Sequence, residues 1–262
     1  TNAQSRVLEE EFIRAGVPYT LVGGTRFYER KEIKDVLCYL RLIENKKDEV
    51  SLRRAEKIGK TKLAKFLSYR ESLESENALI SRTTTEILDN ILSVTSYLSL
   101  YDANIEEEAS RLENIKELRS VALEFPVLRE FLETISLVEQ ASEPRSKSHE
   151  DRKKAVVMST VHASKGLEFP IVFLIGMEEG LFPHSRSVMD KDELEEERRL
   201  CYVALTRAKE KIYLTHANKR LFFGTRTENT ISRFISDIPE WTLSLQVSLD
   251  PSRGFREDDY LL

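Results

Sequence analysis

Two kinds of hydrophobic pattern follow each other along the chain. In residues 3–15 and 29–43 apolar side chains recur at helical spacing, and residues 17–22 between them have the composition of a strand. Strand patterns return in the last third of the chain, at residues 155–160, 170–176 and 211–216. The second of these runs is continuously apolar, as in a strand that is buried on both faces. Helices that alternate with strands over short connections predict an α/β fold with a parallel sheet.

Residues 46–150 follow a different pattern. They contain almost no Gly or Pro, show no strand-like alternation and carry repeated apolar stripes at helical spacing. We therefore predict a mostly α-helical domain inserted into the α/β domain. The α/β domain is then discontinuous and consists of residues 1–45 and 155–240, and residues 241–262 form a carboxyl-terminal tail.

Composition narrows the class of protein. The 262 residues are enough for one large or two modest domains, and the net charge of −5 gives no global basic field. A nucleic-acid site would have to be a local groove. Cys38 and Cys201 lie far apart in helical patterns, which favours buried free thiols over a disulfide or a metal site. No apolar run is long enough for a membrane span and no signal peptide opens the chain, so we expect a cytoplasmic protein with no membrane partner.

The turn at residues 160–168 carries the first candidate chemistry. It lies between two predicted strands, and ligands of parallel α/β proteins gather at the carboxyl ends of strands. Thr160 and His162 offer short polar groups, Gly166 permits close approach, and Glu168 can accept hydrogen bonds from a sugar hydroxyl. A histidine beside a strand can equally be a structural residue held by hydrogen bonds.

The predicted helix at residues 193–208 carries the second group of candidate functional residues. It begins with acidic residues and ends in a basic cluster that includes Arg207, an order that already suits the helix dipole. Arg207 can therefore be only a dipole partner. Alternatively, an arginine placed against a γ-phosphate can stabilise the charge that develops there, because it binds in a bidentate manner and keeps its proton.

These two segments resemble a known family. ThrValHisAlaSerLysGlyLeuGluPhePro (160–170) and GluGluArgArgLeuCysTyrValAlaLeuThrArgAla (196–208) closely resemble motifs V and VI of the UvrD/Rep/PcrA-type superfamily 1 DNA helicases. The resemblance implies a RecA-like domain with a helical insert. It assigns Glu168 to the nucleotide ribose, Arg207 to the γ-phosphate, and Thr160 and His162 to single-stranded DNA. Four other residues of this helix also match the family, and we expect them mainly to hold the helix to the turn: Glu196, Arg198, Arg199 and Tyr202.

The same resemblance implies that three more residues contact single-stranded DNA. Residues 1–10 and 23–35 resemble segments of the second RecA-like domain, in which the residues matching Asn2 and Arg26 lie on single-stranded DNA. Phe223 matches an aromatic side chain that stacks on a base. From spacing alone, Arg26 can be a solvated turn residue and Phe223 a core residue, and Phe222 and Phe223 can exchange roles.

The insert shows a shorter match. Residues 53–65 are placed like the family's helix–hairpin–helix element, which grips the duplex backbone. Gly59 would supply the tight turn, and the phosphate donors would be Lys57, Lys60, Thr61 and Lys62. A solvated, basic start of a helix is the alternative.

The sequence lacks the pattern G-x-x-x-x-G-K-[ST], so it has no phosphate-cradling loop of the Walker type. The chain also begins inside a family motif. We therefore expect the carboxyl-terminal half of a 3′–5′ ATP-dependent DNA helicase, with ATP and Mg²⁺ as cofactors and the Mg²⁺ ligands in a first RecA-like domain upstream of Thr1. The implied partners are single-stranded DNA, a single-strand/duplex junction and that upstream domain. The chain alone should be inactive.

Two alternative functions remain open at this point. The chain can be a non-catalytic DNA-binding or protein-interaction module that retains the fold, which the missing loop would favour. It can also be part of the motor subunit of a helicase–nuclease complex, although no nuclease-like carboxylate cluster is seen near the carboxyl end.

Overall fold

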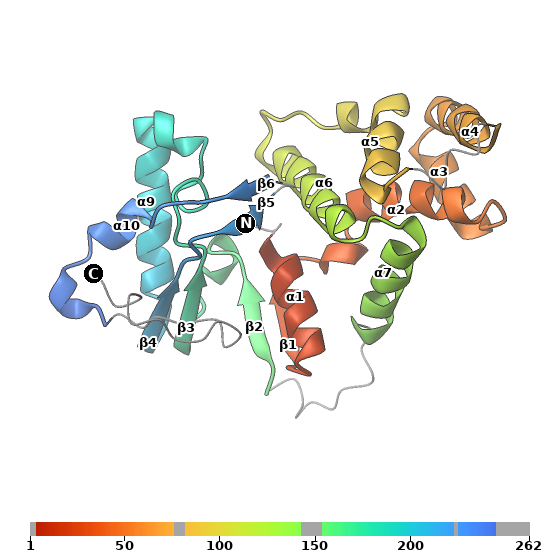
Figure 1. Ribbon diagram of the computed structural model, residues 1–262. Helices are drawn as coiled ribbons and strands as arrows, with labels where there is room; N and C mark the ends of the chain where they lie inside the picture. The colour runs from red at the N-terminus through yellow and green to blue at the C-terminus, as the bar shows by residue number, and fades with distance from the viewer. Residues whose placement is uncertain (1–3, 76–81, 143–153, 223–224, 245–262) are drawn as a thin grey trace, which may run out of the picture.

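The two predicted parts of the chain form two bodies, a sheet with its helices and a bundle of helices (Figure 1). The computed structural model describes residues 4–75, 82–142, 154–222 and 225–244. Of the sheet body, the described helices are α1 (Ser5–Arg14), α9 (Lys191–Leu205) and α10 (Arg233–Ser236). Its described strands are β1 (Tyr19–Val22), β2 (Val156–Ser159), β3 (Phe169–Ile175), β4 (Ala208–Thr215), β5 (Arg220–Phe222) and β6 (Thr225–Thr227).

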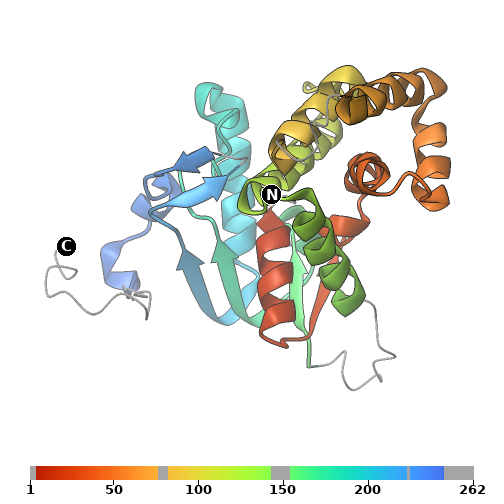
Figure 2. The same cartoon turned by 45° about the vertical axis from the view of Figure 1, so that its right-hand side comes forward.

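Strands β1 to β4 form parallel pairs, as the sequence predicted, whereas β5 and β6 pair antiparallel as a hairpin. Strand β1 pairs with β2, which places Tyr19 opposite Val156, and β3 pairs with β4, which places Phe173 opposite Tyr213. In Figures 1 and 2 the two pairs lie side by side. The α/β class with parallel strands is therefore confirmed. Helix α9 covers one side of β3 and β4, where the sheet body has its apolar core: Leu174, Met177, Cys201, Ala204 and Phe234.

The prediction that the run at 170–176 is buried on both faces is wrong for the described residues. Leu174 points into the core below α9, but Ile171 is 51% and Phe173 64% exposed on the opposite face. There the ring of Phe173 stacks on Tyr213 with 4.6 Å between centroids, and the Lys211 ammonium lies 4.8 Å from the centre of the tyrosine ring. Successive side chains of a strand point to opposite faces, and only one face of this strand is covered by described elements.

The helical body is built from longer helices and a separate core. Its described helices are α2 (Lys31–Glu44), α3 (Glu49–Ile58), α4 (Lys60–Ser75), α5 (Thr84–Val94), α6 (Glu106–Glu124) and α7 (Leu128–Ser142). The 3-10 turns η2 (Phe27–Glu29) and η4 (Tyr97–Leu100) connect some of them. The largest fully buried side chains come from this body and include Phe27, Tyr39, Phe66, Tyr97 and Phe131. The side chains of α2 belong to the same core, since Ile33, Leu37 and Leu40 pack with residues of α5 and α6. The domain boundary at residue 45 stays a prediction, but α2 packs with the helices that follow it.

Polar side chains join the two bodies. Helix α6 presents Glu113, Asn114 and Glu117 to the sheet body, and all three are at most 8% exposed. The guanidinium of Arg6 on α1 donates to Glu117 at 2.8 Å, and Arg30 donates to Asn114 at 2.7 Å. Burial is costly for these charges unless they are paired, so the pairs fix how α6 sits on α1.

The burial pattern of α7 gives a stability prediction. Ile135 is 0% exposed in the helical core, whereas Leu137, two residues along, is 67% exposed. Ile135→Ala should lower the free energy of unfolding by about 2–5 kcal/mol, because it leaves a cavity. Leu137→Ala should change it by about 0.5 kcal/mol or less. Urea unfolding followed by circular dichroism measures both. Equal losses in the two variants would contradict the placement of α7.

Candidate functional site

The turn after β2 is held by its own hydrogen bonds. The hydroxyl of Thr160 accepts from the backbone N–H of Ala163 at 3.2 Å, and the buried hydroxyl of Ser164 donates to the carbonyl of Val161 at 2.7 Å. His162 lies in the resulting 3-10 turn η5 (His162–Ser164), with its side chain exposed. The turn thus presents His162 at the carboxyl end of β2 without using that side chain to build itself.

A second turn packs against the first. Gly23 follows β1 at φ +76°, and a Cβ built on it would lie only 2.7 Å from Cβ of Ala163. Any side chain at this position would push the two turns apart. The structure therefore brings the segment that leads to Arg26 next to the segment that carries Thr160 and His162.

Arg207 connects the end of α9 to the same region. Its guanidinium donates to the carbonyls of Leu167 at 2.9 Å and Val203 at 3.0 Å, and to the hydroxyl of Thr206 at 3.0 Å. The backbone N–H of Phe169 donates to the carbonyl of Arg207 at 2.9 Å. These bonds place Arg207 beside the strand start that follows Glu168.

The partners of Arg207 leave its charge available. All three described acceptors are neutral oxygens, which orient the guanidinium without neutralising it. Glu168 is more than half exposed and pairs with Lys209 at 3.1 Å. Exposed ion pairs of this kind contribute about 0–1 kcal/mol, so Glu168 can exchange Lys209 for a ligand hydroxyl at little cost. The arrangement can hold a group that carries both a phosphate and a sugar.

The expectation that other residues of α9 hold it to this turn is wrong. Arg198 pairs with Asp237 and lies over the ring of Phe234, so it ties α9 to α10. Glu196 pairs with Arg199 within the helix at an exposed site, and Tyr202 is 69% exposed. The side-chain contact with the turn is made by Arg207.

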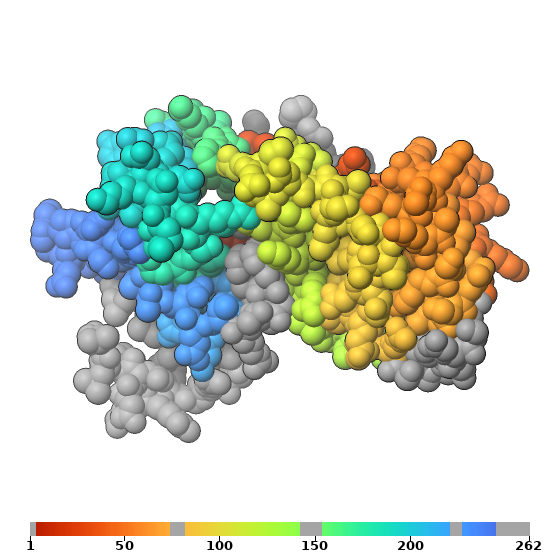
Figure 3. All heavy atoms as spheres, turned by 90° about the horizontal axis from the view of Figure 1, so that it is seen from above, coloured from red at the N-terminus to blue at the C-terminus, as the bar shows by residue number. Residues whose placement is uncertain are grey.

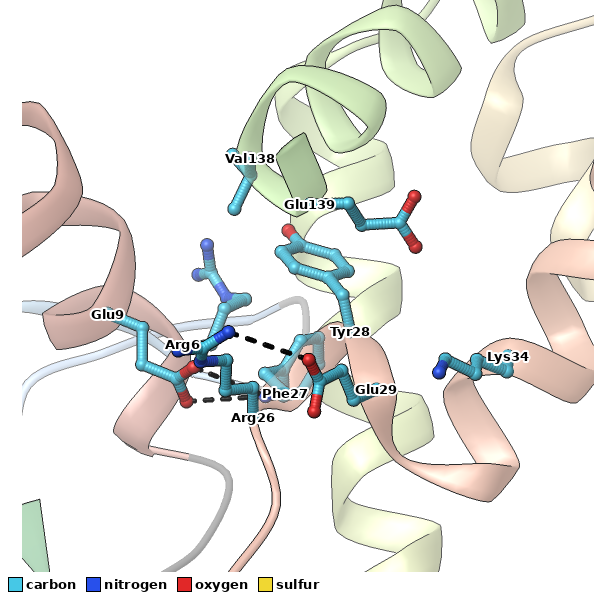
Figure 4. A pocket seen from close by; sticks show the side chains of 9 residues that line it. All are labelled: Arg6, Glu9, Arg26, Phe27, Tyr28, Glu29, Lys34, Val138 and Glu139. Atoms are coloured by element: carbon cyan, nitrogen blue, oxygen red, sulfur yellow. Dashed lines mark hydrogen bonds and ion pairs between the residues drawn. The ribbon is translucent and has the colours of Figure 1, made fainter. Parts of the chain in front are cut away.

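Arg26 lies at the edge of a pocket between the two bodies (Figure 4). Its guanidinium is 3.6 Å from the carboxylate of Glu29. The pocket has a volume of about 240 Å³ and its lining mixes both signs of charge: Arg6, Glu9, Arg26, Phe27, Tyr28, Glu29, Lys34, Val138 and Glu139. The carboxylates of Glu9, Glu29 and Glu139 make this pocket a poor site for a phosphate by itself.

The candidate residues of the insert lie far from this region. Gly59, at φ +153°, separates α3 from α4, and Lys57, Lys60 and Thr61 are exposed around it. Figure 1 shows α3 and α4 at the end of the helical body that is remote from the sheet. Lys62 does not fit the expected role of a phosphate donor, because its ammonium donates within the fold to the carbonyls of Thr95 at 2.9 Å and Ser96 at 2.8 Å, just beyond α5. It fixes this hairpin instead. The structure thus separates these residues from Glu168 and Arg207.

Two predicted residues, Asn2 and Phe223, lie outside the described residues. The hairpin of β5 and β6 that flanks Phe223 is anchored by Glu178, which is 0% exposed. Its carboxylate accepts from Arg220 at 2.7 Å and from the backbone N–H of Ala217 at 2.8 Å. Burial alone would raise the pKa of Glu178, but these hydrogen bonds outweigh it and lower the pKa below the ordinary 4.5.

The residues that anchor the loop at positions 176–186 were not among those that the sequence pattern predicted. Glu178 holds the hairpin through Arg220, and Glu179 makes a bidentate pair with Arg233 of α10 at 2.7 Å. Two adjacent carboxylates directly after a continuously apolar strand were the available signal.

Comparison with known proteins identifies the class. The family model of the UvrD-like helicase C-terminal domain matches residues 1–90 and 61–219, and the chain belongs to this family. Among curated relatives, the ATP-dependent DNA helicase PcrA of Bacillus subtilis is 42% identical over 285 residues, which cover 92% of this chain and 39% of the relative. PcrA of Staphylococcus aureus is 41% identical over 288 residues, with the same coverage. PcrA of Staphylococcus epidermidis is 39% identical over 312 residues, covering 97% of this chain and 42% of the relative. The chain therefore spans about two fifths of the length of these relatives.

The lowered pKa of Glu178 gives a pH prediction. Its ionic contacts contribute stability that is complete above the ordinary value of 4.5 and is lost as the pH falls through the lower folded-state pKa. Glu178→Gln should lower the free energy of unfolding by about 2 kcal/mol at pH 7 and reduce its fall between neutral and acid pH.

Urea unfolding at a series of pH values measures this. Arg220→Met, which removes the cation that depresses the pKa, should flatten the acid dependence in the same way. Acid slopes that match the unaltered protein in both variants would show that Glu178 contributes no such linkage.

Proposed function

We propose that the whole protein is an ATP-dependent DNA helicase that moves 3′ to 5′ along single-stranded DNA, and that this chain forms its second motor domain and helical insert. The observation that carries the proposal is the position of Arg207. Among the described residues its acceptors are neutral oxygens, and through the carbonyl of Leu167 it contacts the turn that also presents His162 and Glu168. Membership of the UvrD-like family supports the same function over a non-catalytic module.

In this proposal Arg207 faces the γ-phosphate of ATP and Glu168 accepts a hydrogen bond from the ribose. Arginine suits the first role because its planar fork matches phosphate oxygens and its charge is permanent. The described residues contain no group of three or more His, Cys, Asp or Glu side chains placed to hold a metal. We assign the Mg²⁺ ligands and the phosphate loop to a partner RecA-like domain of the whole protein, because this sequence has no Walker-type loop. Bound there, Mg²⁺ would neutralise phosphate charge.

Coupling between nucleotide and DNA would run through the short turn. The carbonyl of Leu167 accepts from Arg207 and lies five residues after His162, so a shift of Arg207 toward a phosphate pulls on the segment that faces DNA. The turn after β1, packed against Ala163, carries Arg26 along. Movement of one domain toward another on ATP binding is the usual way in which such a site is completed.

The remaining DNA contacts follow the sequence prediction. Asn2, Thr160 and Phe223 would complete the single-strand path, with Phe223 stacking on a base. The exposed hairpin with Lys57, Gly59, Lys60 and Thr61 would bind duplex phosphates at a single-strand/duplex junction. Its distance from the sheet body fits a contact with duplex ahead of the motor. A DNA substrate is consistent with the cytoplasmic location that the sequence predicted. Separately, none of the helices among the described residues is long and apolar enough to cross a membrane.

The role of Arg207 can be tested in the whole protein. Arg207→Ala should reduce DNA-stimulated ATP hydrolysis by about 10³-fold, the usual loss when an arginine at the γ-phosphate is removed. Binding of single-stranded DNA, followed by fluorescence anisotropy, should stay close to that of the unaltered protein. Arg199→Ala is the matched control, because Arg199 is an exposed arginine of α9. The 262-residue chain alone should show no hydrolysis and sets the background. Turnover near that of the control would remove Arg207 from the site.

The hairpin makes a separate prediction. Replacing Lys57 and Lys60 together by Gln should weaken binding to a single-strand/duplex junction and lower the slope of log K against log salt by about 2, because each phosphate contact contributes about 0.9 to that slope. Binding to single-stranded DNA should not change. Lys191→Gln, an exposed lysine at the start of α9, is the control. An unchanged salt slope at the junction would exclude the hairpin from the duplex contact.

A further inference from the structure

The 176–186 loop contacts both the helix that leads to Arg207 and the helical insert. Its central residue is His184. The backbone N–H of His184 donates to Glu197 of α9 at 3.2 Å, and its ring Nε2 lies 3.2 Å from the carboxylate of Glu113 on α6. One residue therefore touches both elements, although they are separated by more than 80 positions in the chain.

The geometry around the imidazole fixes its direction. The backbone N–H of Arg186 donates to Nδ1 of His184 at 3.3 Å, so Nδ1 is an acceptor and the neutral ring carries its proton on Nε2. That proton points at Glu113, which is 8% exposed. Burial would raise the pKa of Glu113, but the hydrogen bond from His184 outweighs it and lowers the pKa. The bond is thus made to an ionised, nearly buried carboxylate, which favours a strong and directional contact.

The contact occupies a particular place in the junction between the bodies. Glu113, Asn114 and Glu117 of α6 bond to His184, Arg30 and Arg6 respectively. Arg6 and Arg30 belong to the amino-terminal segment, which leads directly into the insert. His184 belongs to the later segment, which also carries Glu168 and Arg207. Close by, Arg186 donates to the carbonyl of Ala103 at 3.4 Å, and in Figure 3 the teal atoms of this region reach the yellow-green atoms ahead of α6.

Helix α9 can carry a displacement between its ends. Glu197 and the last residue, Leu205, are eight positions apart, or about 12 Å along a rigid helix. Arg207 follows two residues later and donates back to Val203 of the same helix. Burial raises the pKa of Glu197, and His184 and His162 oppose that rise.

We propose that His184 is a positioning residue that couples the motor to the helical insert, holding Glu197 of α9 through its backbone and Glu113 of α6 through its ring. A shift of α9 when Arg207 engages a phosphate then moves the loop, and the loop moves α6. A junction built from hydrogen bonds suits this task, since polar interfaces between domains permit relative motion. The inference rests on the proposed helicase function.

The test compares two activities of the whole protein in the same mixture, ATP hydrolysis and unwinding of a duplex with a 3′ single-stranded tail. His184→Ala should keep hydrolysis within about twofold and lower the base pairs unwound per ATP by about tenfold, the factor expected for loss of one charge-assisted hydrogen bond. His184→Gln, whose amide can still donate to Glu113, should restore most of the coupling. Ser185→Ala, at the exposed neighbouring position, is the control.

A double-mutant cycle shows whether the two side chains act together. Glu113→Gln should reduce the coupling as His184→Ala does, and the two changes combined should add little. Equal losses of hydrolysis and unwinding in His184→Ala would indicate a purely structural residue and overturn the inference, as would unchanged coupling. An unaltered protein that neither hydrolyses ATP nor unwinds DNA would instead refute the proposed function.

Discussion

The packing of helix α9 against the turn after β2 depends on the guanidinium of Arg207. It donates to Leu167 and Val203, so the end of α9 and the turn after β2 share one side chain. The acceptors of this arginine must be neutral if its charge is to stay available for a ligand. A carboxylate in their place would hold the arginine as firmly but would cancel the charge that a phosphate needs. The hydrogen bonds to Leu167, Val203 and Thr206 thus hold the guanidinium in place and leave its charge available to a phosphate.

The two bodies differ in how they are held. Each has an apolar core of its own, whereas the junction between them consists largely of the polar face of α6. Glu117 illustrates the consequence. Its Oε1 accepts from Arg6, but within the described residues its Oε2 has no hydrogen-bond partner, and burial raises the pKa of Glu117. A buried carboxylate that is only half satisfied makes this contact easier to open than a packed core.

Local pattern was sufficient to predict the class of fold, whereas the roles of the site residues came from the resemblance to a family and stay predictions. Helical spacing and continuous apolar runs located the helices and the parallel strands, and the segments around Glu168 and Arg207 lie together as their motifs implied. Periodicity could not show which face of β3 is covered, because an apolar run looks the same with one neighbour or two. The contacts of Arg198, Glu178 and His184 were also out of reach. They join residues 39 to 71 positions apart, and nothing local specifies such partners.

The contact between Gly23 and Ala163 has a consequence for how the sequence can change. The two turns at the end of the sheet meet through a hydrogen atom on one side and a methyl group on the other. There is no side chain in between to trim or to repack, so a larger residue on either turn would act as a wedge. Drift at one position would require a matching change at the other, and glycine's positive φ leaves few residues that could follow. The smallest side chains of this region are therefore among its least replaceable.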